Sequence, residues 1–186
     1  MKYDIIYADP PWQYSSGGAR GGKFDKLDYP TMSIKELKQL PVANISADDC
    51  ALFMWVTSPF LAESVEIAKA WGFKYIRVDK VWSKKTTSGK PHAVCGPWGM
   101  TDVEFILLFT KGKICSKQRG VRNNLTLGEV VEAVYPGKHS RKPDIFRNDI
   151  LRRFPLTLNR LEMFAREKPL GWDVFGNEVS DSVEIK

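Results

Sequence analysis

The sequence predicts an α/β fold in which a mostly parallel sheet carries helices on both faces. Short apolar runs alternate with segments of helical periodicity, which favours parallel strands joined by crossover helices. The apolar runs are rich in β-branched and aromatic residues and show little polar alternation, as expected for strands covered on both faces. With 186 residues, 43% of them hydrophobic, the chain is long enough to form one domain with a sizeable core.

The strands are expected where these apolar runs occur, with turn residues between them. They are predicted at residues 3–8, 49–57, 75–82, 103–110, 130–135, 160–166 and 172–178. Residues 13–28 and 84–100 are expected to be irregular, and loops of this length in a compact domain are usually functional. The polar tail after Val179 is expected to fray.

Capping signals mark three helices. Ser33 and Glu36 have the spacing of a capping box and predict a short helix that begins there. Ser58-Pro59 opens a second helix, and Gly72 lies just past its expected end. Pro143 begins a third helix that is expected to run to about Phe154.

Composition and charge limit the class of protein. No apolar stretch reaches the length of roughly 18 residues that a membrane helix needs, and no signal peptide is visible. Three cysteines lack the pairing of a secreted scaffold, so a cytoplasmic location is expected, or a nuclear one if the source is eukaryotic. The net charge of +6 favours a polyanionic partner. Two basic runs are interpreted either as solvated loops or as phosphate contacts: Lys84, Lys85, Lys90 and Lys111, Lys113, Lys117, Arg119, Arg122.

The segment Asp9-Pro10-Pro11-Trp12 follows the first expected strand directly. Ligands of open α/β sheets bind at the carboxyl ends of the strands. A carboxylate and a proline carbonyl accept hydrogen bonds from an amine, and an indole offers a broad face to a flat ring. The segment therefore fits an exocyclic amine on a base. The alternative interpretation is a plain turn with a tryptophan in the core.

An ordered set of motifs resembles a known family. After Asp9-Pro10-Pro11-Trp12 come segments 29–33, 52–57, 139–143, 162–166 and 176–178, which read YPTMS, LFMWVT, HSRKP, EMFAR and GNE. The set is similar to the MT-A family, typified by the catalytic seventy-kilodalton subunit of the messenger-RNA N6-adenosine methyltransferase. The resemblance covers residues 3–178. It implies a Rossmann-like class I methyltransferase in permuted order, with the catalytic motif first and the cofactor motif last, that uses S-adenosyl-L-methionine.

The resemblance also implies roles for particular residues. The catalytic segment is Asp9, Pro10, Pro11 and Trp12, and Trp12 and Tyr29 would hold the acceptor base. Asp9 would also hold the cofactor's amine, and Lys142, just before an expected helix start, suits the cofactor's carboxylate. The remaining cofactor contacts are expected from Glu162, Phe164, Arg166, Asn177 and Glu178. No metal is expected, because His92-x-x-Cys95 lacks a second ligand pair.

Two departures from related sequences bear on these assignments. Phe164-Ala165-Arg166 stands where related permuted DNA methyltransferases carry a glycine-rich turn, and Glu178 stands where an amide is usual. The function expected is methyl transfer to the N6 amine of adenine in nucleic acid, with DNA preferred. RNA methylation and a non-catalytic nucleic-acid-binding partner of the same fold are the alternatives. No separate target-recognition domain is apparent in residues 1–186, so recognition is expected from loops, a partner subunit or a second copy.

Overall fold

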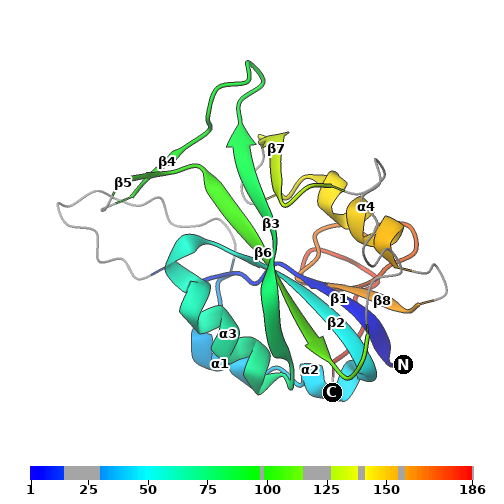
Figure 1. Ribbon diagram of the computed structural model, residues 1–186. Helices are drawn as coiled ribbons and strands as arrows, with labels where there is room; N and C mark the ends of the chain where they lie inside the picture. The colour runs from blue at the N-terminus through cyan, green and yellow to red at the C-terminus, as the bar shows by residue number, and fades with distance from the viewer. Residues whose placement is uncertain (15–29, 97–98, 115–126, 138–140, 155–157, 186) are drawn as a thin grey trace.

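The computed structural model describes residues 1–14, 30–96, 99–114, 127–137, 141–154 and 158–185. These residues form a central sheet with strand order β7-β3-β6-β2-β1-β8-β9 (Figure 1). The strands are β1 Tyr3–Ala8, β2 Ser46–Val56, β3 Lys74–Lys85, β6 Val103–Lys111, β7 Val130–Val134, β8 Arg160–Met163 and β9 Asp173–Phe175. All seven of the predicted strands are therefore present.

The sheet is mostly parallel. Strand β1 pairs in parallel with β2 and β8, β8 with β9, and β3 with β7. Only β6 runs antiparallel to its neighbours, β2 and β3. The carboxyl ends of the other strands in this sheet therefore meet at one edge, where α/β folds bind ligands.

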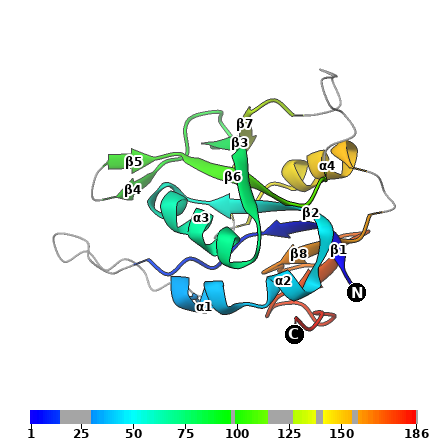
Figure 2. The same ribbon diagram turned by 60° about the horizontal axis from the view of Figure 1, so that its bottom comes forward.

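Helices cover both faces of the sheet, as the sequence predicts. The helices α1 Ile34–Gln39 and α3 Leu61–Ala70 lie on one face, and α4 Asp144–Arg153 lies on the other (Figures 1 and 2). Strand β1 contributes to both layers: Ile6 packs with the α1 and α3 residues, while Ile5 and Tyr7 pack with the α4 residues. The fold class is thus confirmed.

The helix boundaries follow the capping signals closely. Ser33 accepts from the Glu36 backbone N–H, and the Glu36 carboxylate accepts from the Ser33 N–H, which completes the predicted capping box. The segment Ser58–Phe60 forms a 3₁₀ turn, η1, that leads into α3. A further short helix, α2 Val42–Ile45, was not predicted, because four residues give no periodic pattern to detect.

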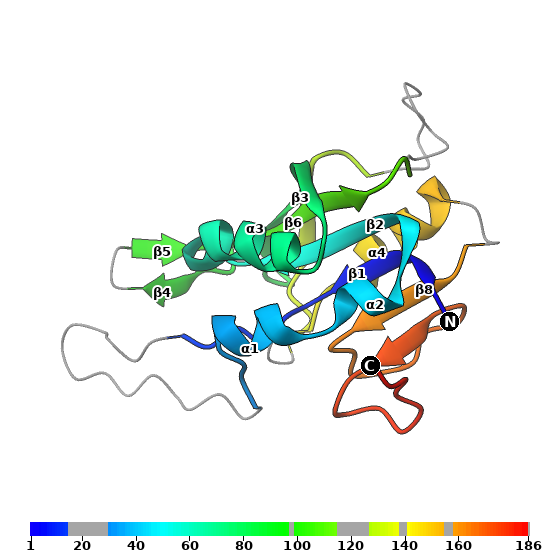
Figure 3. The same cartoon turned by 90° about the horizontal axis from the view of Figure 1, so that it is seen from below.

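Three regions differ from the sequence prediction. Residues 84–100 are partly regular: β3 continues to Lys85, and β4 Val94–Gly96 pairs with β5 Gly99–Thr101 in a hairpin that extends away from the main sheet (Figure 3). Strand β8 ends at Met163, because Phe164 takes a left-handed conformation with φ 63°. The tail was expected to fray after Val179, but it contacts β9, because Val183 donates its N–H to the Val174 carbonyl at 2.7 Å.

Within the described ranges, no helix has the length and apolar content needed to span a membrane.

Candidate active site

The acid of the first motif lies at the carboxyl end of β1. Strand β1 ends at Ala8, and the next residue, Asp9, donates its backbone N–H to the Met163 carbonyl at the end of β8 (3.3 Å). The side chain of Asp9 is 30% exposed. The parallel pairing of β1 with β8 therefore holds a solvent-accessible carboxylate at the edge where the other parallel strands also end.

A chain of alternating charges extends from Asp9. The Lys142 ammonium lies 2.9 Å from Asp9 Oδ2 and 3.3 Å from Glu104 Oε2. The other oxygen of Glu104 lies 2.6 Å from the Lys84 ammonium. Glu104 comes from β6 and Lys84 from β3, and the side chains of both are about nine-tenths buried. The network thus joins the end of β1, the start of α4 and two neighbouring strands.

The charges in this network set one another's protonation. Burial raises the pKa of Asp9, and the Lys142 ammonium opposes that rise. For Glu104 the neighbouring ammonium groups of Lys142 and Lys84 outweigh burial and lower the pKa. Burial lowers the pKa of Lys142, but Asp9 and Glu104 reverse this and leave it raised. The site therefore holds a permanent cation beside a carboxylate whose proton affinity is increased.

Lys142 contacts a buried aromatic pair, Trp55 and its hydrogen-bond partner Tyr7, through the Trp55 ring. The Lys142 ammonium lies 5.5 Å from the ring centroid of Trp55, a residue of β2 that is 1% exposed. Trp55 donates its indole N–H to the Tyr7 hydroxyl at 2.6 Å. Burial raises the pKa of Tyr7 well above its ordinary value, so this phenol stays protonated. Sequence reasoning gave Glu104, Trp55 and Tyr7 no role in the site, and it placed Lys84 in a basic run and not in this network. A lone acid within the apolar strand 103–110 was the one available signal.

The tryptophan of the first motif is buried, and backbone hydrogen bonds hold its two prolines in place. Trp12 is 5% exposed, its ring stacks on Phe60 at 4.9 Å, and its indole N–H donates to the Trp55 carbonyl at 3.3 Å. The Trp12 side chain is therefore part of the core, as in the alternative interpretation, and its role in holding the base stays a prediction. The Pro10 carbonyl accepts from Trp12 N–H, and the Pro11 carbonyl accepts from Met32 N–H, both at 2.9 Å.

Glu162 lies beside Asp9 on the neighbouring strand. It is paired in register with Tyr7, and its Oε2 is 3.0 Å from a guanidinium nitrogen of Arg147 on α4. Burial raises the pKa of Glu162 to about 7, although Arg147 acts in the opposite direction. Helix α4 and the residues before it therefore supply a cation to each of the two acids, Lys142 to Asp9 and Arg147 to Glu162.

The remaining cofactor candidates gather where β8 and β9 end. The Phe164 ring contacts Phe175 edge-on at 6.0 Å, and Arg166 Nε lies 3.5 Å from Glu178 Oε1. The closest approach is at Gly176, where a Cβ would lie 2.1 Å from the Ala165 carbonyl oxygen. Asn177 follows in an exposed turn. A cavity of about 200 Å³ opens here between Arg166, Glu167, Lys168 and residues 178–181.

Some sequence predictions concern other parts of the chain. Tyr29, the second residue expected to hold the base, and the basic residues Lys117, Arg119 and Arg122 lie outside the described residues. Lys84 was placed in a basic run interpreted either as a solvated loop or as phosphate contacts, but the structure buries it against Glu104. In the described part of the chain, no three His, Cys, Asp or Glu side chains are grouped so that they could hold a metal ion.

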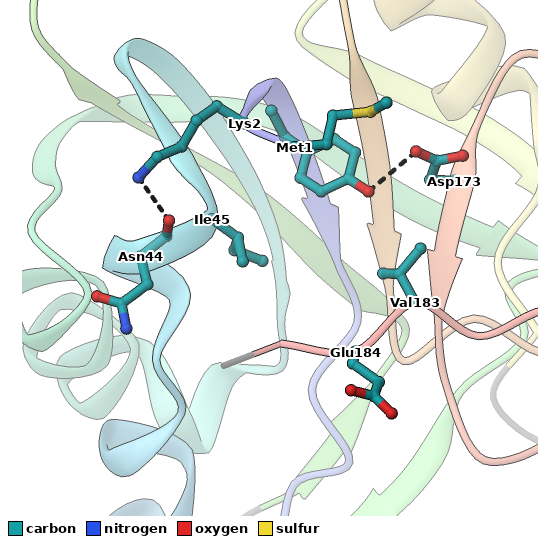
Figure 4. A pocket seen from close by; sticks show the side chains of 8 residues that line it. Met1, Lys2, Asn44, Ile45, Asp173, Val183 and Glu184 are labelled. Atoms are coloured by element: carbon teal, nitrogen blue, oxygen red, sulfur yellow. Dashed lines mark hydrogen bonds between the residues drawn. The ribbon is translucent and has the colours of Figure 1, made fainter.

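A larger cavity lies at the opposite edge of the sheet. It has a volume of about 540 Å³ and is lined by Met1, Lys2, Tyr3, Asn44, Ile45, Asp173, Val183 and Glu184 (Figure 4). These residues surround the start of β1, about 20 Å along the strand from Asp9 at the usual rise per residue. Because the charged network and the strand ends lie at the other edge, this cavity is not the candidate active site.

The fold and the site together define a class of protein. The sheet has one antiparallel strand, an acid follows its first strand, and hydrogen-bond acceptors follow its last strands. This is the arrangement of a Rossmann-like methyltransferase with permuted motif order.

Comparison with known proteins gives the family. Residues 3–178 match the family model described as MT-A70. The type II methyltransferase M.MunI of Mycoplasma sp is 39% identical over 99% of this chain and 81% of its own length. The N6-methyladenosine RNA methyltransferase MTA1 of Cryphonectria parasitica is 31% identical over 95% of this chain and 52% of its own length. The human N(6)-adenosine-methyltransferase catalytic subunit METTL3 is 27% identical over 96% of this chain and 28% of its own length. The chain belongs to the MT-A70 family of N6-adenine methyltransferases, which confirms the resemblance.

Proposed function

We propose that this protein transfers a methyl group from S-adenosyl-L-methionine to the N6 amine of adenine in DNA. The observation that carries the proposal is the Asp9 carboxylate, held at the carboxyl edge of the sheet 2.9 Å from Lys142. The preference for DNA rests on the type II methyltransferase M.MunI, which is more similar to this chain than the RNA methyltransferase MTA1 or METTL3.

The residues at the strand ends fit the cofactor that MT-A70 methyltransferases use, S-adenosyl-L-methionine. Asp9 would hold its amine and Lys142 its carboxylate, because the two side chains lie together with opposite charges. Glu162 would accept hydrogen bonds from the ribose hydroxyls of the cofactor. The adenosine of the cofactor would lie near the cavity of about 200 Å³, in contact with Phe164, Arg166, Asn177 and Glu178. When bound, the cofactor supplies an activated methyl group on a sulfonium.

Asp9 and Pro10 would act on the acceptor amine. The amine of adenine is a weak nucleophile because its lone pair is delocalised into the ring, so orientation is the main contribution the protein can make. Holding two reactants in line can supply roughly 7–11 kcal/mol of such a barrier. The Pro10 carbonyl keeps a second lone pair after its bond to Trp12, and the Asp9 carboxylate can accept an amine hydrogen. Acceptors on these hydrogens favour the positive charge that develops on the nitrogen.

We infer that residues 1–186 form one methyltransferase domain, because the described helices and main-sheet strands pack into the two cores on either side of that sheet. Recognition of the target sequence would then come from a second copy, a partner subunit or the loops at the active edge, which is the edge of the sheet where the parallel strands end beside Asp9.

The test is methyl transfer from labelled S-adenosyl-L-methionine to single- and double-stranded DNA and RNA, followed by digestion to nucleosides. We expect labelled N6-methyladenine in DNA. The variant Asp9→Ala should lose at least about 100-fold in turnover while its thermal unfolding stays within a few degrees of the parent. Near-normal turnover of Asp9→Ala would show that the active site has been placed wrongly.

The same experiment separates the alternatives. Label in RNA but not in DNA would favour the function named for MTA1 and METTL3. A non-catalytic partner would transfer no label, and calorimetry would then detect no binding of S-adenosyl-L-methionine to the protein.

A further inference from the structure

Three aromatic rings form a column that runs from the core to the surface. The rings of Trp82 and Tyr135 stack with centroids 6.4 Å apart and planes 18° apart. His92 stacks on Tyr135 at 4.3 Å and 7°. Trp82 is 1% exposed, whereas Tyr135 and His92 are partly exposed. In contrast, Trp82 meets the core ring Trp55 edge-on, at 73°. The column therefore changes the edge-to-face packing of the core into the parallel stacking that nucleic-acid bases adopt.

The backbone fixes all three rings to the end of β3. His92 donates its N–H to the Lys84 carbonyl at 2.9 Å, and Tyr135 donates its N–H to the Lys85 carbonyl at 2.8 Å. Trp82 donates its indole N–H to the Ala133 carbonyl on β7 at 3.0 Å. The turn between β3 and His92 is closed by a bond from Thr86 N–H to the Lys90 carbonyl at 2.7 Å. A ring held in this way loses little conformational entropy when a ligand stacks on it.

The column stands at the active edge of the sheet, beside the charged network. Strands β3 and β7 run parallel to β1, so their carboxyl ends lie at the same edge as Asp9. Lys84 connects the two features, because its ammonium lies 5.4 Å from the Trp82 ring and 2.6 Å from Glu104. The exposed residue Lys90 adds positive charge on the turn next to His92, where it can reach a phosphate.

We propose that this ring column is a stacking platform for the base next to the target adenine in DNA. The proposal rests on the proposed function, since an adenine that reaches Asp9 has left its stack. The base beside it then has one uncovered face, and an aromatic ring can replace the lost neighbour. The outermost ring of the column, His92, provides such a ring at the same end of the sheet as Asp9.

The test measures coupling between His92 and the neighbouring base by fluorescence anisotropy. The probes are three labelled strands. One is an oligodeoxythymidylate with one central deoxyadenosine; the other two have an abasic position directly 5′ or directly 3′ of that deoxyadenosine. We expect His92→Ala to bind the intact strand about 10-fold more weakly than the parent protein. The parent protein should bind one of the two abasic strands more weakly than the intact strand by a similar factor. His92→Ala should bind that abasic strand and the intact strand with equal affinity, as expected for two groups that contact each other.

Controls separate stacking from folding and from catalysis. His92→Phe keeps a ring and should retain the parent affinity, and all variants should bind S-adenosyl-L-methionine with unchanged affinity and unfold at similar temperatures. Equal affinity of His92→Ala and the parent for the intact strand overturns the platform, and so does additive weakening by the variant and the abasic position. Coupling with an oligouridylate probe alone overturns the assignment to DNA. If the coupling is found but no nucleic acid is methylated, the platform stands and the proposed function fails.

Discussion

At the residue scale, the site is organised around Lys142, which lies between two acids. Asp9, Lys142, Glu104 and Lys84 carry two negative and two positive charges. Buried ion pairs stabilise a fold weakly, because desolvation offsets most of their attraction. Perturbed pKa values in such a cluster are more typical of functional sites. We therefore expect substitutions here to alter chemistry more than stability when charge is conserved.

Removal of the Lys142 charge should move the pH profile of the reaction. Lys142 lowers the pKa of Asp9, while burial and Glu104 raise it. In Lys142→Met the Asp9 carboxyl would therefore take up a proton at higher pH, and a protonated carboxyl accepts the amine hydrogen less well. The acidic limb of kcat/KM should therefore move to higher pH. Lys142→Arg keeps the charge and should keep the limb in place. An unshifted limb in Lys142→Met would contradict a catalytic role for the Asp9 carboxylate.

Glu162 should make the stability of the protein depend on pH. Its pKa is raised from 4.5 to about 7, so the native protein holds this proton more tightly than the unfolded chain does. The resulting stabilisation is fully present below about pH 4.5 and is lost as the pH rises through about 7. Glu162→Gln lacks this titration. Its free energy of unfolding relative to the parent should therefore rise by about 2 kcal/mol from about pH 5 to about pH 8, measured by urea unfolding. A constant difference would show that Glu162 is not buried enough to titrate near neutrality.

The sequence predicted some of these residues and missed others for physical reasons. Asp9 and Lys142 stand next to local signals, a strand end and a helix start. Glu104 meets Lys84 only when β6 and β3 pair, and it meets Lys142 only when the residues before α4 fold over the sheet; no local pattern reports these contacts. Trp12 was expected either to hold the base or to lie in the core, and the contact of its ring with Phe60, 48 positions away in the chain, has no local signal.

At the element scale, the ends of β8 and β9 show how the cofactor region is built. The sequence prediction extended β8 to Arg166, because residues 160–166 read as one strand. The strand ends three residues earlier because Phe164 takes φ 63°, a conformation that its side chain disfavours locally. Contacts outside the strand impose it: the Phe164 ring meets Phe175, and Ala165 donates its N–H to the Phe175 carbonyl at 3.0 Å.

This turn should require glycine at position 176. In Gly176→Ala the new Cβ would lie 2.1 Å from the Ala165 carbonyl oxygen, so the ends of β8 and β9 must separate. We expect a loss of about 1–3 kcal/mol in the free energy of unfolding and weaker binding of S-adenosyl-L-methionine by calorimetry. Gly128→Ala is the matched control, because its nearest atom would be the Val130 carbonyl oxygen at 3.8 Å, an ordinary contact. Equal behaviour of the two variants would exclude a close approach at Gly176.

At the scale of the whole molecule, the covering of both faces of the sheet follows from patterns that the sequence contains, whereas the strand order is known only from the structure. The alternation of apolar runs and capped helices predicted the layers correctly. The sequence gives no comparable signal for the position of α4 on its face of the sheet. That position is fixed by a buried cluster in which Arg153 binds both oxygens of Asp79 at 2.8 Å and lies 2.9 Å from Asp149. Lys80 completes the cluster, with its ammonium 3.7 Å from Asp149.

This cluster should be the main polar contribution to docking of α4, and its loss should be measurable. Arg153→Met leaves the carboxylates of Asp79 and Asp149, which are 5% and 0% exposed, with Lys80 as the cation that still lies within 4 Å of both. Breaking a buried pair by removing one partner typically costs about 3–5 kcal/mol, so urea unfolding should report a loss of that size. Arg152→Met, an exposed neighbour on the same helix, should change stability by less than about 0.5 kcal/mol. Because α4 also carries Arg147 and follows Lys142, Arg153→Met should in addition weaken binding of S-adenosyl-L-methionine, although it contacts neither Asp9 nor Glu162. Parent-like binding in a folded Arg153→Met would show that the sheet edge alone positions Lys142.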